Sequence, residues 1–200
     1  MSAMSRQEAM QKLAAFKQLH SSKIDNVLTN RTLYFRFEPG VDTIIGSTGF
    51  EGCFGVVIVS ARGCVVAHMT PTGNSVNNAK AKIESYYNSY PAILDDEKAY
   101  IYAQVNYFSG PNQGNVMYPE LYGQLFAHLK SLHSDGAAPT LVKYVDPQDV
   151  CHDPKGNPLP GFNSDNAEYA SLVVKSGADQ NSAPIVQFIT TDMQYHAVRV

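Results

Sequence analysis

Apolar residues recur along the chain with two different periods, one typical of helices and the other of strands. Within residues 5–19 they return every three or four positions, which is the spacing of one face of a helix. The same spacing follows three candidate capping residues, Thr72, Asn74 and Ser75, and ends before Pro91. A third helical pattern, with a proline in its first turn, runs through residues 118–133. We therefore expect three helices, the first of which is a peripheral N-terminal helix within residues 1–24.

Strand patterns fill most of the remaining chain. They are short runs in which β-branched and aromatic residues either alternate with polar ones or follow each other without a break. The expected strands cover residues 31–39, 43–47, 53–60, 63–70, 98–108, 140–146, 168–177 and 183–192. Because strands follow one another in groups and the helices are inserted between these groups, the order predicts an α+β fold with mixed, mainly antiparallel sheets.

Composition narrows the class of protein. Two hundred residues with 44% hydrophobic content can bury one sizeable core, so we expect residues 1–200 to form a single domain. The 15 lysine and arginine residues and 18 acidic residues give a net charge of -3, which disfavours nucleic acid and anionic membranes as partners. Charged residues interrupt the N-terminal apolar positions, and three cysteines cannot all pair, so we expect a cytoplasmic protein with free thiols and neither a signal peptide nor a transmembrane segment.

One apolar hairpin carries the most distinctive chemistry. Its two runs, "CFGVVIVS" and "GCVVAHMT", are separated by "ARG" and contain a thiol at Cys53 and an imidazole at His68. If Ala61 and Arg62 form a two-residue turn, Cys53 and His68 are diagonal neighbours on one face of the hairpin, where long side chains can touch. A three-residue loop with a bulge at Gly63 would instead send them to opposite faces. The spacing thus permits a Cys-His dyad on condition that the turn is the shorter one.

A glycine-rich segment precedes the cysteine. Three glycines among the eight residues that end at Cys53 favour exposure of the thiol and a tight backbone approach, in which N–H groups can face a developing oxyanion. Ser47 and Thr48 supply the nearest hydroxyls that can orient the imidazole. The same glycines can equally serve only to turn the chain from one strand into the next.

This segment resembles the Cys/His signature of the glutamine deamidases of the cytotoxic necrotizing factor type and of the chemoreceptor deamidases of the CheD type. The shared features are a Gly-Cys at the start of an apolar strand, a short turn, and a histidine fifteen residues after the cysteine, near the end of a second strand. The resemblance covers about 25 of the 200 residues and implies a sandwich of mixed sheets with flanking helices.

The resemblance also implies a reaction. Cys53 would be the nucleophile, His68 the general base, and Ser47 the hydroxyl that orients the imidazole. The substrate would be a protein with an exposed glutamine, whose side-chain amide is hydrolysed, and transglutamination is the related reaction. This thiol chemistry requires no metal and no organic cofactor.

Structural interpretations of the same residue types stay open. Free cysteines are among the most buried residues, and Cys64 points into the core by strand alternation. Cys151 and His152 stand together in the proline-rich loop of residues 146–167, but no partner pair such as Cys-x-x-Cys supports a zinc site. We therefore expect no metal, and the role of that loop stays open, since loops of this length are often functional or mobile.

Two further functions compete with the deamidase hypothesis. A non-catalytic binding module with a degenerate hydrolase-like fold would present the loop or a tyrosine-lined surface to a protein or glycan. A cysteine peptidase would share the dyad and differ in admitting a main-chain amide to the cleft. His128 and His133 lie five positions apart on the expected helix, which disfavours a shared ligand and indicates solvated or capping roles.

Overall fold

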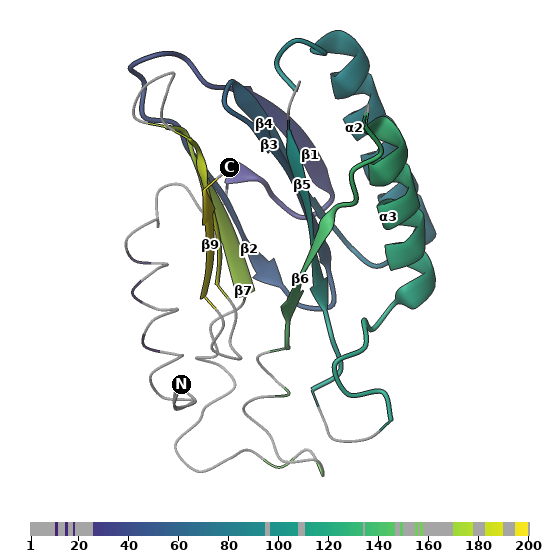
Figure 1. The fold of residues 1–200 in the computed structure, drawn as a ribbon. Coiled ribbons are helices and arrows are strands. Elements are labelled where there is room, and N and C mark those ends of the chain that lie inside the picture. The colour runs from purple at the N-terminus through teal and green to yellow at the C-terminus, as the bar shows by residue number, and fades with distance from the viewer. Residues whose placement is uncertain are drawn as a thin grey trace.

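Helices and strands form three layers in the computed structural model of the chain (Figure 1). Helices α2 (Gly73–Ser89) and α3 (Pro119–Leu132) form one outer layer, a five-stranded sheet the middle layer, and a four-stranded sheet the third. The structure describes residues 11, 15, 18, 26–94, 97–107, 111–133, 135–146, 149, 155, 157, 170–177, 183–189 and 195–199. Within these ranges, no helix has the length and apolar character needed to cross a membrane.

The middle layer has the strand order β1-β4-β3-β5-β6. Its strands are β1 (Arg31–Arg36), β3 (Phe54–Ser60), β4 (Gly63–Met69), β5 (Lys98–Gln104) and β6 (Thr140–Tyr144). Neighbouring strands are antiparallel except β5 and β6, which are parallel and are connected through α3. The hairpin of β3 and β4 therefore lies inside the sheet, with a further strand on each side.

The third layer has the order β2-β7-β8-β9, and all of its neighbouring strands are antiparallel. Its strands are β2 (Ile44–Phe50), β7 (Ala170–Lys175), β8 (Ile185–Ile189) and β9 (Tyr195–Arg199). β2 comes directly before β3 in the chain but pairs with the distant β7, so residues around β2 connect the two sheets. The chain therefore passes from one sheet to the other between β2 and β3, and the glycine-rich segment lies next to the hairpin.

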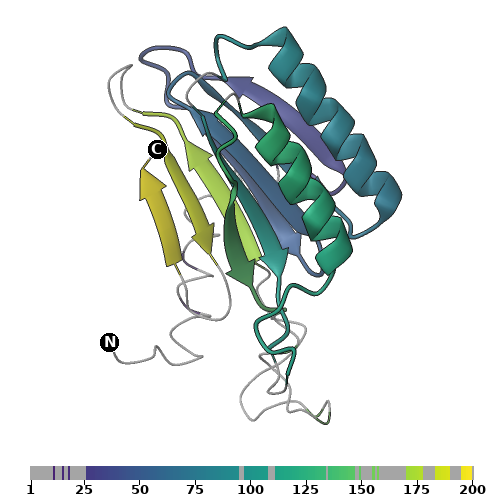
Figure 2. The same ribbon diagram turned by 45° about the vertical axis from the view of Figure 1, so that its right-hand side comes forward.

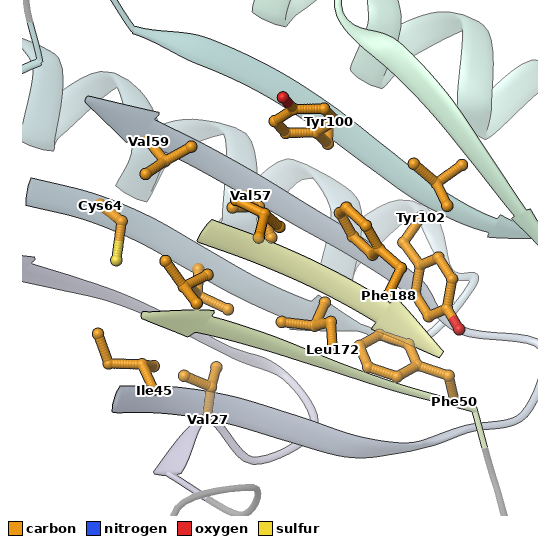
Figure 3. Packing of buried hydrophobic residues seen from close by; sticks show 14 of the residues in the cluster. Val27, Ile45, Phe50, Val57, Val59, Cys64, Tyr100, Tyr102, Leu172 and Phe188 are labelled. Carbon is orange, nitrogen blue, oxygen red and sulfur yellow. The ribbon is translucent and has the colours of Figure 1, made fainter. Parts of the chain in front are cut away.

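Two apolar clusters hold the layers together. One lies between the sheets and includes Phe50, Val57, Leu172 and Phe188, which gather beside one another in Figure 3. The other lies between the five-stranded sheet and the two helices, which cover the sheet's opposite face in Figure 2. Every residue of β3 and β4 is buried because both faces of this hairpin are covered. Burial of each valine or isoleucine stabilises the fold by about 1.5–3 kcal/mol. The hairpin therefore stabilises both the packing between the two sheets and the packing of the sheet against the helices.

The predicted α+β class with mainly antiparallel strands is confirmed, and the two sheets face each other as in a sandwich. α2 and α3 lie where the helical patterns predicted them. The expected strand at residues 43–47 is too short, because β2 continues to Phe50, whose ring is fully buried between the sheets. β9 was not predicted from the sequence.

Two other expectations concern the first part of the chain. The alternating pattern after residue 30 predicted a half-buried strand, but β1 is partly covered on both faces: Leu33 and Phe35 pack against the cluster between the sheets, and Tyr34 packs against the cluster below the helices. The peripheral N-terminal helix of residues 1–24 falls mostly outside the described residues. Gln11, Ala15 and Gln18, which are described, are helical.

Candidate active site

The register of the central hairpin decides where the predicted dyad residues lie. Ser60 pairs with Gly63 across a two-residue turn, and the ladder continues to Gly55 opposite His68 and Phe54 opposite Met69. The shorter of the two possible turns is therefore the one that forms. Cys53, one position before Phe54, lies on the same face of the sheet as His68, and this face is turned toward the four-stranded sheet.

A hydrogen-bonded relay from β2 holds His68. The Ser47 hydroxyl lies 2.9 Å from Nδ1 of His68 and donates to the backbone carbonyl of Val27 at 2.6 Å. A carbonyl oxygen can only accept, so the single hydroxyl proton of Ser47 is directed at Val27. Ser47 must then accept the proton of Nδ1–H. This arrangement fixes the neutral imidazole as the tautomer with a lone pair on Nε2.

The remaining nitrogen of His68 is buried without a partner. Its Nε2 atom makes no hydrogen bond within the described part of the chain, although the residue has no exposed surface. Desolvation lowers the pKa of His68 from 6.5 to about 4, so the ring is neutral around pH 7. An unpaired acceptor in an interior costs free energy, and such atoms call for an explanation. A proton donor that is supplied during a reaction is one such explanation.

Phe50 covers one face of this imidazole. The two rings are stacked with centroids 4.0 Å apart, and Phe50 also makes an edge contact with Tyr102 at 5.0 Å. Gly55, directly opposite His68, leaves room for the phenyl ring: a Cβ atom there would lie 3.0 Å from Cε1 of Phe50 and 3.1 Å from Cδ2 of Leu172. The sequence did not single out Phe50, because its role depends on β2 joining the other sheet.

Cys53 lies at the edge of the same apolar cluster. Only 7% of its surface is exposed, so the exposure expected from its glycine-rich neighbours is wrong. Desolvation raises the pKa of the Cys53 thiol, an effect that a backbone hydrogen bond from Glu51 partly offsets. The Tyr144 hydroxyl donates to the Cys53 carbonyl at 2.7 Å and fixes the backbone at this point. The thiol is therefore neutral and held in place before any substrate arrives.

The thiol and the imidazole are not hydrogen-bonded in this structure. Because Nε2 of His68 has no partner among the described residues, the bond that the dyad requires at this nitrogen is not formed. Cys53 and His68 lie on the face of the five-stranded sheet that is turned toward the four-stranded sheet. Ser47 of the four-stranded sheet is hydrogen-bonded to His68 across this interface. Apo active sites often have loose catalytic contacts that tighten with substrate.

The backbone turns sharply in the glycine-rich segment just before Cys53. Gly49 and Gly52 have φ angles of +80° and +71°, a conformation that disfavours residues with a Cβ atom. A Cβ atom on Gly52 would lie 3.6 Å from Oε1 of Gln104 and 3.7 Å from the hydroxyl of Tyr118. Gln104 is buried, so a side-chain amide and a phenol approach the backbone just before the thiol. Both are groups that sequence reasoning missed, because they come from β5 and the start of α3.

Other candidate residues have structural partners. Thr48, the second hydroxyl expected to orient the imidazole, instead bonds Ser171 at 2.8 Å. Cys64 is fully buried, as predicted for a core residue, and desolvation raises the pKa of its thiol strongly. Cys151 and His152, together with most of the loop of residues 146–167, lie outside the described residues. Among those described, three or more Cys, His, Asp or Glu side chains do not gather as a metal site needs.

Of the two histidines, His133 is the C-cap residue of α3, in line with the capping role expected, and neither side chain is fully solvated. His133 is buried, and its Nδ1 atom lies 3.2 Å from the Glu97 carboxylate, which also accepts a hydrogen bond from Tyr87 at 2.7 Å. His128 is half-buried, with Nε2 3.1 Å from the Lys80 carbonyl of α2. Both side chains thus tie α3 to neighbouring elements.

Comparisons with known proteins found no relative. The chain matches no protein-family model, no curated protein and no solved structure.

Proposed function

We propose that this protein is a thiol-dependent amidohydrolase that deamidates a glutamine side chain of a protein substrate, with Cys53 and His68 as its catalytic pair. The relay from Val27 through Ser47 to Nδ1 of His68 is the observation that carries the proposal. It leaves Nε2 as a desolvated lone pair on the face that also carries Cys53. A general base needs this tautomer and this orientation.

The reaction follows from the protonation states. Both pKa shifts favour neutral forms, a thiol at Cys53 and an imidazole at His68, so the resting pair is not a thiolate and an imidazolium. Nε2 takes the thiol proton as sulfur attacks the carboxamide carbon, and the imidazolium then gives that proton to the leaving ammonia. Water, activated by the same nitrogen, hydrolyses the thioester to glutamate and restores the thiol. A primary amine in place of water would give transglutamination.

Substrate binding has to bring the thiol and Nε2 together. The glycine segment supports such an adjustment, because its φ angles near +70° to +80° hold Cys53 on a turn rather than within the β3 ladder. Gln104 and Tyr118 lie beside Gly52, where their polar groups can contact an incoming amide. The Tyr118 hydroxyl can donate to a developing negative charge and so lower the barrier to acyl transfer, whereas Oε1 of Gln104 can only accept from the amide N–H.

A non-catalytic binding module is the second candidate, and two observations favour it. Cys53 is largely buried, and Phe50 stacks on the imidazole, as in a packed interior. In that case His68 and Ser47 would serve only to join the two sheets. The cysteine peptidase alternative shares the thiol mechanism and differs in its substrate.

Ammonia release separates these functions. The purified chain is incubated with benzyloxycarbonyl-Gln-Gly and, separately, with unfolded casein, and ammonia and glutamine-to-glutamate conversion are measured. The deamidase proposal predicts product that depends on Cys53 and His68, so that C53A and H68A lose activity while C151S keeps it. Cleavage of the casein backbone without ammonia release would indicate the peptidase. Equal signals from wild type, C53A and H68A would overturn the proposal.

A further inference from the structure

A polar cavity opens where three elements meet at the end of the hairpin that carries the candidate pair. It has a volume of about 640 Å³ and lies between the start of β1, the end of β4 and the first turns of α2. Cavities of this size are typical of sites for small molecules or for several residues of a peptide. His68 and Thr70 are part of its wall.

The cavity and Cys53 lie at the same end of the hairpin. Phe54 pairs with Met69, so the next position along the two strands brings Cys53 alongside Thr70. Thr70 lines the cavity together with Met69. The cavity lies on the α2 side of the five-stranded sheet, whereas Cys53 packs on the side that faces the four-stranded sheet, so a peptide bound in the cavity would pass around this end of the hairpin to bring its glutamine to the thiol.

The charge of the cavity is opposite to that of the chain. Arg31 and Lys82 line it, and no acidic residue does so within the described part of the chain. The chain as a whole has a net charge of -3. Both basic side chains are exposed, and the Lys82 ammonium lies 5.6 Å from the centre of the Tyr86 ring. Two cations and no acidic residue among the described lining residues favour an anionic occupant.

The wall of the cavity is fixed by one side chain. Asn30 adopts a φ of 62°, and its Oδ1 atom accepts hydrogen bonds from the Thr70 backbone at 3.1 Å, from the Thr70 hydroxyl at 3.0 Å and from the Ser75 hydroxyl at 2.5 Å. Thr72 caps α2 by accepting from the Ser75 backbone at 3.3 Å. These bonds tie the three elements together, so the basic side chains project from a rigid frame.

We propose that this cavity binds a carboxylate of the protein substrate, so that the preferred target glutamine is flanked by aspartate or glutamate. The inference rests on the deamidase function for its substrate, but the binding itself does not require chemistry. Arg31 and Lys82 supply the charge, and Asn30 holds the elements that position them. A carboxylate is the group that charge-assisted hydrogen bonds from these side chains recognise.

Binding is measured on the inactive C53A variant, so that turnover does not interfere. Fluorescein-labelled peptides with a central glutamine carry two flanking glutamates, two glutamines or two lysines, and their affinities are compared by anisotropy. We expect the glutamate peptide to bind about tenfold more tightly than the neutral one and to weaken as salt is added. Equal affinity of the three peptides would overturn the proposal.

Charge reversal assigns the binding to the cavity. In the C53A background, R31E with K82E should abolish the preference for glutamate and favour the lysine peptide. R36E with K130E is the matched control, because it changes the net charge equally at exposed residues away from the cavity, and it should keep the preference. If both double variants behave alike, the cavity is not the site.

The outcomes keep the two proposals apart. Ammonia release that depends on Cys53 but shows no preference for acidic peptides leaves the deamidase function standing and rejects the cavity. A preference for glutamate peptides that R31E with K82E abolishes, without any ammonia release, supports the cavity as a binding site and rejects the deamidase function.

Discussion

His68 is the residue whose environment differs most from that of an ordinary strand residue. Its ring is bonded on one nitrogen, unpaired on the other, stacked on one face and excluded from water. The Ser47 hydroxyl is the partner of Nδ1, and because it accepts the Nδ1–H proton it leaves Nε2 as the unprotonated nitrogen of the ring.

Replacement of Ser47 by alanine should impair both stability and activity. The Val27 carbonyl and Nδ1 of His68 would lose their shared partner in a buried place, which costs about 1–3 kcal/mol of unfolding free energy. Loss of the fixed tautomer should lower kcat by about two orders of magnitude, the lower end of the roughly 10²–10⁴-fold that general acid–base catalysis contributes. Urea denaturation and ammonia release measure the two effects.

Ser60 provides the matched control for Ser47. It is also buried, and its hydroxyl donates to the Ile93 carbonyl at the far end of β3. S60A should destabilise the chain to a similar degree but leave kcat close to that of the wild type. If S47A and S60A have the same kcat, Ser47 has only a structural role.

The low pKa of His68 predicts a loss of stability in mild acid. In the unfolded chain the imidazole titrates near 6.5, while burial lowers its pKa in the folded chain to about 4. Between these values the unfolded state binds a proton that the folded state excludes, so this stabilisation is complete above pH 6.5 and falls as the pH drops to about 4. The loss is about 3 kcal/mol, at about 1.4 kcal/mol for each pH unit.

The same titration in a variant isolates the contribution of His68. Unfolding free energies of wild type and H68N are measured in urea at several values between about pH 7 and pH 4. H68N should show a shallower decline over this range, since the other titrating groups are common to both proteins. Parallel curves would show that His68 does not titrate with a lowered pKa.

At the scale of elements, the central hairpin determines which side chains share a face. Its two apolar runs and short turn are local in sequence, so the sequence reduced its register to two alternatives, and the structure has the one that puts Cys53 and His68 on a common face. Membership of β2 in the second sheet could not be predicted, because its partner β7 lies far along the chain and the pairing depends on tertiary packing. For that reason Phe50 was missed, although the Ser47 hydroxyl was correctly placed beside the imidazole.

Contacts between side chains of different helices and strands could not be predicted from the sequence either. The contact of His133 with Glu97 joins the end of α3 to the start of β5, and no local pattern in either segment indicates it. The burial of Cys53 was also mispredicted, because glycines indicate backbone freedom but not what packs over them. Periodicity therefore predicted elements and faces, and it failed where a contact depended on which layers meet.

Gly55 tests the packing of the hairpin against Phe50. An alanine there would place a methyl group 3.0 Å from the Phe50 ring and 3.1 Å from Leu172 and from Cβ of Tyr102. Such overpacking should destabilise the chain by about 1–3 kcal/mol. Thermal unfolding of G55A measures the loss. G123A, on α3, has open space around the new methyl group and should stabilise the chain by a few tenths to about 1 kcal/mol.

On the scale of the whole molecule, the three layers seal Cys64 inside the middle of the fold. It belongs to the cluster between the sheets, and no part of its surface is exposed. A thiol reagent such as 5,5'-dithiobis(2-nitrobenzoic acid) can reach it only when the sheets separate. In a C53A/C151S background, labelling of Cys64 should therefore be slow in buffer and accelerate steeply in urea. Rapid labelling without denaturant would contradict the layered core.

The central claim is that Cys53 attacks a glutamine side chain with the help of His68, and trapping the thioester tests it most directly. The chain is mixed with benzyloxycarbonyl-Gln-Gly, quenched in acid, digested and analysed by mass spectrometry. We predict an acyl adduct, equal to the substrate less ammonia, on the peptide that contains Cys53, and none in H68A. An adduct confined to Cys64 or Cys151, or no adduct while ammonia is released, would contradict the account.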